Sequence, residues 1–326
     1  MNGVIIVPTG LGAEIGGHAG DANPVVKLFS SICDNVITHP NVCNASDINE
    51  MTEKTLYVEG SILDRFLQGE IGLKKVNYNK ILLATNLPVL NETINAVSAA
   101  RATIGADISI IGLKTPLMMH ARIEDNHATG DVFGWQELIE QVKEYEFDAL
   151  ALATPIIVDY EVAMNYMRVG GINPWGGIEA KASKLIANFL NKPVAHSPNN
   201  HTLKGYNEIS DPRMAAEIVS MTYLHCILKG LHKAPRITTF EKGLNVDSVD
   251  FMISPYGCLG IPHQACLDRN IPVIMVKENK TCLDIEPDEK FIIVENYWEA
   301  AGYVLSMKSG VLPSALRRPL KETIYI

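Results

Sequence analysis

The chain has 326 residues, of which 47% are hydrophobic and 20% charged, so it has ample apolar material for the core of a globular protein. Its formal net charge of −9, without any cluster of Lys and Arg, argues against a nucleic-acid-binding surface. No apolar stretch reaches the roughly 18 residues that a membrane-spanning helix needs. The six cysteines are scattered without a CxxC pair, and no signal peptide precedes the first predicted strand. We therefore expect reduced thiols and a cytoplasmic location.

Short apolar segments alternate with helical patterns along the chain. In the first part, such segments begin near residues 4, 35, 55, 80 and 108. This alternation predicts an α/β fold with a mostly parallel, Rossmann-like sheet and helices on both faces. We expect these five strands to lie in one sheet, with their carboxyl ends on the same edge. Two lobes, residues 1–155 and 156–326, and one continuous unit both fit the pattern.

Residues 113–134 link the fifth of these strands to the next predicted helix and are rich in charged and histidine side chains. Connections longer than about 12–15 residues in a compact domain are typically functional or mobile. We therefore predict a long polar connection here.

A glycine-rich segment follows the first predicted strand, the β-branched run Val4–Val7. Residues 8–23 hold five glycines, one histidine and two carboxylates. Glycines can take positive φ and bring backbone N–H groups close to a ligand, and ligands of open α/β sheets bind at the carboxyl ends of the strands. The spacing fits neither the dinucleotide fingerprint nor a P-loop. A tight strand-to-helix connection is the alternative, but we expect an active-site loop, with the main pocket against it and with Trp175 or Cys258 in that pocket.

Polar side chains follow several predicted strands, in both halves of the chain. Because the carboxyl ends of parallel strands share one edge, we expect these side chains to converge on one crevice. The predicted substrate-binding residues are Gly17, Asn23, Asn44, Glu59, Asn86, Trp175, His196 and Gly257.

His18 and His39, together with Asp21 or Asp47, have the side-chain types of a metal site or of a base with its orienting partner. The spacing does not choose between these, since no HxH or HExxH is present, and structural histidines fit equally well. Imidazole titrates near neutral pH, so it can both take and give a proton. We predict His18 as the main acid–base group, Asp21 as the residue that orients its ring, and His39 as a further catalytic group.

Two motifs of the second half add candidates. Cys258 lies in a glycine-flanked loop between a strand and a short helix, where a helix N-terminus could stabilise a thiolate nucleophile, although a buried inert cysteine fits as well. Residues 173–177, NPWGG, offer an aromatic plate and backbone N–H groups suited to a carboxylate or phosphate. A Trp175 packed under a tight turn is the alternative.

The motifs GGHAGDANP, ITHPNVCNASD, NPWGG and SPYGCLGIP, spread over the whole chain, resemble an uncharacterised bacterial family known only as a domain of unknown function. This resemblance implies no activity. A weaker likeness is to the aspartate/glutamate racemase superfamily, whose two lobes each place a cysteine after a strand. Cys258 matches one such context, but Ala84 stands where the other cysteine would be, so two-thiol racemisation is not implied.

From these observations we expect an enzyme that uses acid–base chemistry on a small, polar, carboxylate-bearing metabolite. The sequence does not choose between a hydrolase and an isomerase or lyase, and a non-catalytic ligand-binding or sensor protein is the alternative. We predict no organic cofactor, leave a divalent metal open, and expect neither nucleic acid nor membrane as a partner. A homo-oligomer is also left open.

Overall fold

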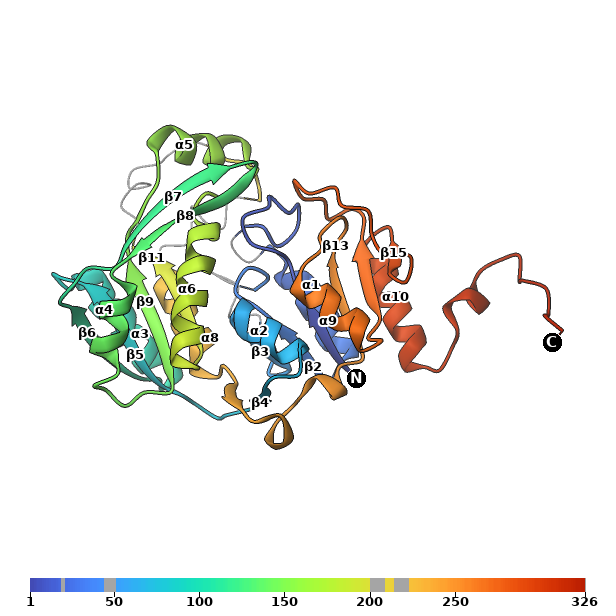
Figure 1. Ribbon diagram of the computed structural model, residues 1–326, viewed down its shortest axis with the longest axis horizontal. Coiled ribbons are helices and arrows are strands. Elements are labelled where there is room, and N and C mark those ends of the chain that lie inside the picture. Colours follow the sequence, from blue (N-terminus) through green and yellow to red (C-terminus); the bar gives the residue numbers. More distant parts are fainter. Residues whose placement is uncertain (19–20, 44–50, 200–208, 214–222, 326) are drawn as a thin grey trace.

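The computed structural model describes residues 1–18, 21–43, 51–199, 209–213 and 223–325. It confirms the predicted α/β class, because two parallel sheets are flanked by helices on both faces (Figure 1). A two-stranded sheet and a three-stranded sheet that contains a hairpin complete the strands.

The first sheet has six parallel strands in the order β15-β14-β13-β1-β2-β3. Val4 of β1 pairs with Met252 of β13 on one side and with Ile37 of β2 on the other. The strand order reverses at β1, so the loop after β1 begins at the topological switch point, where such sheets bind ligands. The strands are β1 (Asn2–Ile5), β2 (Asn35–Thr38), β3 (Thr55–Tyr57), β13 (Phe251–Pro255), β14 (Val273–Val276) and β15 (Ile292–Val294).

The second sheet has four parallel strands in the order β11-β9-β5-β6. They are β5 (Lys80–Asn86), β6 (Asp107–Leu113), β9 (Ala149–Thr154) and β11 (Val194–Pro198). The prediction of a single sheet was therefore wrong, because β1 and β5 belong to different sheets. The chain changes sheet between β3 and β5 and returns between β11 and β13, whereas the predicted division fell near residue 155. We call the part around the first sheet the first lobe and the part around the second sheet the second lobe.

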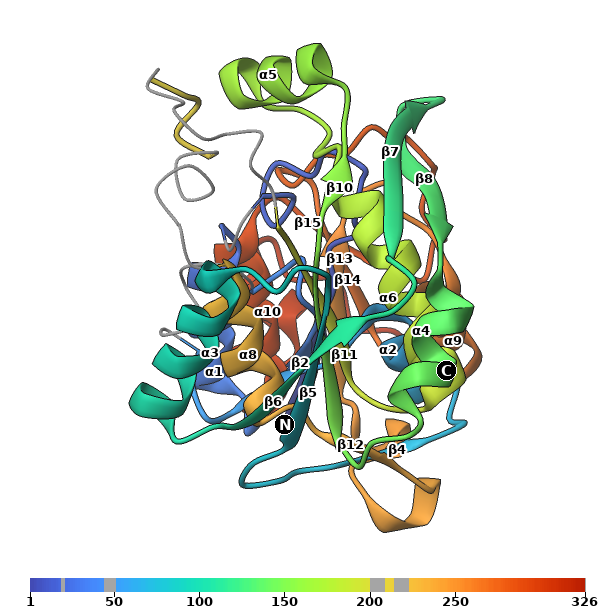
Figure 2. The same ribbon diagram turned by 90° about the vertical axis from the view of Figure 1, so that its left-hand side faces the viewer.

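Helices cover both faces of each sheet (Figure 1, Figure 2). In the first lobe α1 packs with α10 and α2 packs with α9; in the second lobe α3 packs with α8 and α4 packs with α6. The lobes meet where α2 packs against α6, and each of the two apolar clusters contains residues of both sheets. The helices are α1 (Asn23–Ile32), α2 (Gly60–Leu67), α3 (Asn91–Ile104), α4 (Trp135–Val142), α5 (Tyr160–Val169), α6 (Gly176–Leu190), α8 (Tyr223–His232), α9 (Ile261–Asp268) and α10 (Tyr297–Lys308).

Residues 113–134 are not the long polar connection that we predicted. They contain the antiparallel hairpin β7 (Met118–Glu124) and β8 (His127–Phe133), with β10 (Ile156–Ile157) parallel to β7. Asp125 and Asn126 form its turn with positive φ values of 46° and 59°, the conformation that matches the twist of two paired strands. The hairpin and α5 lie at the same end of the molecule (Figure 1, Figure 2).

Candidate active site

The glycine-rich loop lies against the second lobe. The Gly10 carbonyl accepts a hydrogen bond of 3.0 Å from the N–H of Ala128 in β8. A Cβ on Gly177, in the first turn of α6, would lie 1.9 Å from the Ala128 carbonyl oxygen, and a Cβ on Gly176 would lie 2.9 Å from Thr9. The glycines of NPWGG therefore allow α6 to approach the hairpin and the loop closely.

His18 joins the two lobes from within this loop. Its side chain is buried, with 3% of the residue exposed, and its Nδ1 lies 2.7 Å from the hydroxyl of Tyr166 on α5. Its Nε2 is also buried and has no hydrogen-bond partner among the described residues. Burial lowers the pKa of His18 to about 4, with the charge of Arg213 acting in the same direction and that of Asp211 opposing it. The imidazole is therefore neutral at pH 7.

Asp21 shapes the loop and makes no contact with the imidazole ring among the described hydrogen bonds. Its Oδ1 accepts the N–H of Gly16 at 2.8 Å and that of His18 at 3.4 Å. Burial raises its pKa to about 6, against the effect of these two hydrogen bonds. The group that contacts the His18 ring is the Tyr166 hydroxyl and not the carboxylate of Asp21 that we expected.

A charged cluster lies beside His18. The guanidinium of Arg213 binds Asp211 through Nε at 3.0 Å and through Nη2 at 3.2 Å, and its Nη1 lies 2.5 Å from Glu14 of the loop. The charge of Arg213 also acts on Asp21, whose pKa it lowers. The Arg213 guanidinium therefore places a positive charge beside the loop. It is bound by the carboxylates of Asp211 and Glu14, which are both partly exposed.

Two aromatic side chains support His18 from the second lobe. The ring centroids of His18 and Tyr166 are 5.7 Å apart, and Trp175 meets Tyr166 edge to face at 5.8 Å. Trp175 is buried directly before α6. It therefore packs behind Tyr166. The sequence-based expectation placed Trp175 in the main pocket, and it lines neither of the two most prominent pockets in the described part of the chain.

His39, also predicted as catalytic, has a different environment. Its Nε2 accepts the backbone N–H of Val7 at 3.1 Å, which ties the end of β1 to the end of β2. Burial lowers its pKa to about 4. The nitrogen that a base would use is thus occupied by the backbone.

Cys258 is buried, and its Sγ lies 3.3 Å from the hydroxyl of Thr281. Burial raises the pKa of this thiol, which opposes thiolate formation. The preceding Gly257 has a φ of 75°, and a Cβ there would approach the Leu283 carbonyl to 3.0 Å. These observations favour a packed thiol over an activated nucleophile.

Among the predicted substrate-binding residues, Glu59 and Asn86 are held by backbone. The Glu59 carboxylate caps α2 by accepting the N–H groups of Ser61 and Ile62, and burial raises its pKa. The Asn86 amide makes two hydrogen bonds with the backbone of Leu117.

Two further predicted residues, Gly17 and Asn23, lie in or beside the loop. Gly17 allows close packing, since a Cβ would lie 2.5 Å from the Ala13 carbonyl. Asn23 is buried at the start of α1, and Asn44 and Asp47 lie outside the described residues.

His196 belongs to a second buried polar cluster, at the carboxyl edge of the second sheet. Its Nδ1 lies 2.9 Å from a Glu179 carboxylate oxygen, and its Nε2 lies 3.0 Å from the Thr154 hydroxyl and 3.1 Å from the Thr154 carbonyl. Both ring nitrogens are therefore in contact with protein groups. The predicted crevice thus splits into separate clusters, because the strands that carry the residues belong to two sheets.

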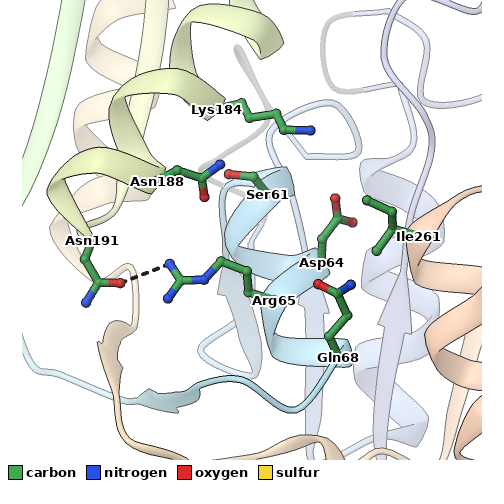
Figure 3. A pocket seen from close by; sticks show the side chains of 8 residues that line it. All are labelled: Ser61, Asp64, Arg65, Gln68, Lys184, Asn188, Asn191 and Ile261. Atoms are coloured by element: carbon green, nitrogen blue, oxygen red, sulfur yellow. Dashed lines mark hydrogen bonds between the residues drawn. The ribbon is translucent and has the colours of Figure 1, made fainter. Parts of the chain in front are cut away.

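The main pocket was expected against residues 10–23. Neither of the two most prominent pockets in the described part of the chain touches that loop. One of them, of about 510 Å³, lies between α2 and α6 (Figure 3) and is lined by Ser61, Asp64, Arg65, Gln68, Lys184, Asn188, Asn191 and Ile261. Within the described residues, no group of three His, Cys, Asp or Glu side chains is arranged to hold a metal ion.

Tyr166 and Arg213 were not predicted as site residues. Tyr166 lies in a regular amphipathic helix whose other buried residues are apolar, and it meets His18 across 148 residues of sequence. Arg213 follows Asp211-Pro212, a pattern that is typical of a helix start. The sequence therefore suggests a structural position for Arg213 and not a place in a site. No local signal marks either residue.

Comparisons with known proteins identify a family and a relative but no activity. Residues 2–317 match a family described as "Protein of unknown function (DUF3326)". An uncharacterised lipoprotein of Synechococcus sp. is 33% identical over 347 aligned positions, which cover 100% of this chain and 96% of the relative. No solved structure matches the chain. The expected kinship to an uncharacterised family is confirmed, and neither match supports the racemase likeness. None of the helices in the described residues is both long enough and apolar enough to cross a membrane.

Proposed function

The chain belongs to this family of unknown function, and from its site geometry we propose an enzyme that uses His18 for proton transfer on a small, carboxylate-bearing metabolite. The observation that carries the proposal is the buried Nε2 of His18, which has no hydrogen-bond partner among the described residues. A buried polar atom without a partner costs roughly 1–3 kcal/mol. A bound substrate group that hydrogen-bonds Nε2 would recover this energy.

His18 can act as a general base from its neutral form. Burial lowers its pKa to about 4, so it accepts a proton less readily than the near-neutral imidazole expected from the sequence. When the Nδ1–H donates to the Tyr166 hydroxyl, the Nε2 lone pair faces the substrate. The low pKa keeps that lone pair free at neutral pH. A general base in such a position contributes about 10²- to 10⁴-fold to the rate. We assign proton transfer to His18 and not to His39, whose Nε2 is bonded to Val7.

Arg213 supports a carboxylate-bearing substrate. Its Nη1 binds Glu14, whose side chain is about half exposed. A substrate carboxylate can replace Glu14 on that nitrogen while Asp211 keeps the guanidinium oriented through Nε and Nη2. The charge pairing would then hold the substrate beside His18.

Substrate must reach a buried nitrogen, so the two lobes have to move apart where His18 meets Tyr166 of α5. The chain crosses between them close to the antiparallel pair β4 (Gly72–Lys74) and β12 (Arg236–Thr238). There the Asn79 amide donates to the carbonyls of Leu231 and Ala234, fastening one crossing to the other. Two adjacent crossings form a natural hinge for closure over a ligand.

We propose a cytoplasmic location, on the basis of scattered free cysteines. The Synechococcus relative is named a lipoprotein, and this name favours a membrane-anchored form for that protein. Fractionation of cells that produce the chain tests the point, since recovery in the membrane fraction after a high-salt wash would contradict a cytoplasmic protein.

The proposed reaction is tested with a panel of 2-hydroxy, 2-amino and 2-oxo acids and small esters and amides, each incubated with the protein in D₂O and followed by ¹H NMR. We expect at least one panel member to lose an α-proton signal or form a product, with His18→Gln inactive but still stabilised by the same compound in thermal shift. Binding without conversion by the unaltered protein would favour a sensor. Activity that is lost on chelation and restored by zinc or manganese would make His18 a metal ligand.

A further inference from the structure

The last part of the chain projects from the body of the molecule. After α10, residues 309–325, which we call the C-terminal arm, extend away from the first lobe (Figure 1). Five large apolar side chains of the arm are between 58% and 94% exposed: Leu312, Leu316, Leu320, Ile324 and Tyr325. So many exposed large apolar side chains within one short segment suggest a surface that a partner covers.

The outer face of α10 is a matching apolar surface on the same lobe. Trp298 is 77% exposed, and Leu305 lies two helical turns further along the same face, while Ala300, Ala301 and Val304 face the core. Gly302 lies between Trp298 and Leu305, and a Cβ there would meet nothing within 4 Å. The exposed side of α10 thus carries Trp298 and Leu305 with the small Gly302 between them. We call these three residues the α10 face.

Charge complements shape in this region. Residues 317–322 of the arm carry Arg317, Arg318 and Lys321 against one carboxylate, Glu322. Residues 284–299, which lead into and begin α10, carry six carboxylates and one lysine. An ion pair between Arg317 and Glu299 already joins the base of the arm to α10. Residues 313–316 of the arm also contact α10, yet Trp298 and Leu305 stay 77% and 51% exposed.

We propose that this chain forms a two-fold symmetric dimer in which the arm of each copy lies across the α10 face of the other. Each copy has an apolar, basic arm and an apolar α10 face with acidic surroundings. In a two-fold dimer the same arm-to-face contact forms twice, so the arms and faces of both copies are covered. This proposal is independent of the proposed reaction.

The test begins with the mass of the full chain by light scattering after size exclusion. We expect twice the chain mass of 35.8 kDa. Dilution should shift the Trp298 fluorescence to longer wavelength as the face becomes exposed. A mass of one chain at all concentrations would overturn the proposal.

Two variants separate the partners of the contact. The double variant Leu320→Asp with Ile324→Asp makes the arm less apolar. Gly302→Glu places a charged side chain on the α10 face and causes no clash in the monomer. Each should weaken dimerisation at least tenfold and leave the melting temperature of the monomer nearly unchanged. Ile94→Asp, an exposed apolar residue of α3, is the control and should leave the dimer intact. Unaltered dimerisation in both variants would contradict the exchange.

Mixing the arm variant with the α10-face variant gives the sharpest result. A mixed dimer keeps one intact contact, between the unaltered arm of one copy and the unaltered face of the other. We expect mixed dimers at concentrations where each variant alone is a single chain. If the arms bind each other, or each folds onto its own α10, mixing restores nothing.

Discussion

His18 and His196 occupy comparable places in the two lobes, and the difference between them is instructive. His18 lies in the loop after β1 and His196 lies within β11, near the carboxyl edge of its sheet, and each is almost completely buried. Both nitrogens of His196 contact Glu179 or Thr154, whereas His18 keeps one nitrogen without a partner among the described residues. His196 is thus satisfied by the fold alone, whereas the proposed function assigns the unpartnered nitrogen of His18 to a ligand. The predictions below test this contrast.

The largest expected effect is on activity at His18. His18→Gln keeps a hydrogen-bonding group beside Tyr166 but cannot transfer a proton, so kcat should fall by about 10²- to 10⁴-fold. The melting temperature should stay nearly unchanged. Tyr166→Phe is the companion variant, and its smaller loss should come from poorer orientation of the ring. Full activity in His18→Gln would end the assignment of His18 as base.

At His196 the effect should be on stability. His196→Ala leaves the Glu179 carboxylate and Thr154 without their ring partner. A buried group that loses its hydrogen-bond partner costs about 1–3 kcal/mol, and we expect a loss in this range. Urea denaturation measures the change. A double-mutant cycle with Glu179→Gln should show coupling, and additive effects would mean that the pair contributes no interaction energy.

A loss of stability of similar size should follow from a substitution that pushes α6 away from the hairpin. Gly177→Ala places a methyl group 1.9 Å from the Ala128 carbonyl, so α6 must move away from the hairpin. We expect a loss of about 1–3 kcal/mol. Gly60→Ala, where a Cβ meets nothing within 4 Å, is the matched control in the first turn of α2 and should be neutral or slightly stabilising. Equal effects of the two substitutions would argue against close packing as the role of Gly177.

The smallest effect at neutral pH should be that of His39→Gln, about 1 kcal/mol, since glutamine can still accept the Val7 N–H. The pH dependence is more informative. The pKa of His39 is about 4 in the folded protein and about 6.5 when unfolded, so the unfolded state binds the extra proton in between. Stability should therefore fall as the pH drops from 6.5 to 4, by up to about 1.4 kcal/mol per unit for this group.

The free energy of unfolding is measured against pH for the unaltered protein and for His39→Gln. The difference between the two curves gives the contribution of proton uptake by His39. It is needed because Asp21, whose pKa is raised to about 6, contributes with the opposite sign as the pH falls from 6 to 4. Parallel curves for the two proteins over this pH range would show that folding does not lower the pKa of His39.

The class of the fold could be predicted from the sequence, but the partition into sheets could not. Apolar strands that are buried on both faces carry no record of their neighbours, so nothing in Val4–Val7 points to Phe251–Pro255 rather than to Ile81–Ala84. The hairpin of residues 118–133 was predictable in principle. Its two strands flank Asp125-Asn126, residue types that accept the positive φ of a two-residue turn.

The site was predictable only in part. The glycine-rich loop pointed to His18, because glycines bring backbone close to other groups. Here, though, those groups are Ala128 and Gly177 of the second lobe. Tyr166 and Arg213 come to His18 through tertiary packing between lobes, which leaves no trace in local spacing. For the same reason the sequence could not separate His39, with its backbone partner, from His18.

The pairing of β1 with β13 has a consequence for synthesis. The central strand of the first sheet emerges early from the ribosome, yet its neighbour Phe251–Pro255 follows only after the entire second lobe has been made. Since chains lengthen at about 5–20 residues per second, β1 waits on the order of ten seconds or more with one edge unpaired. The nascent chain should thus acquire protease resistance first in residues 80–198, and only near release in the segment that carries His18.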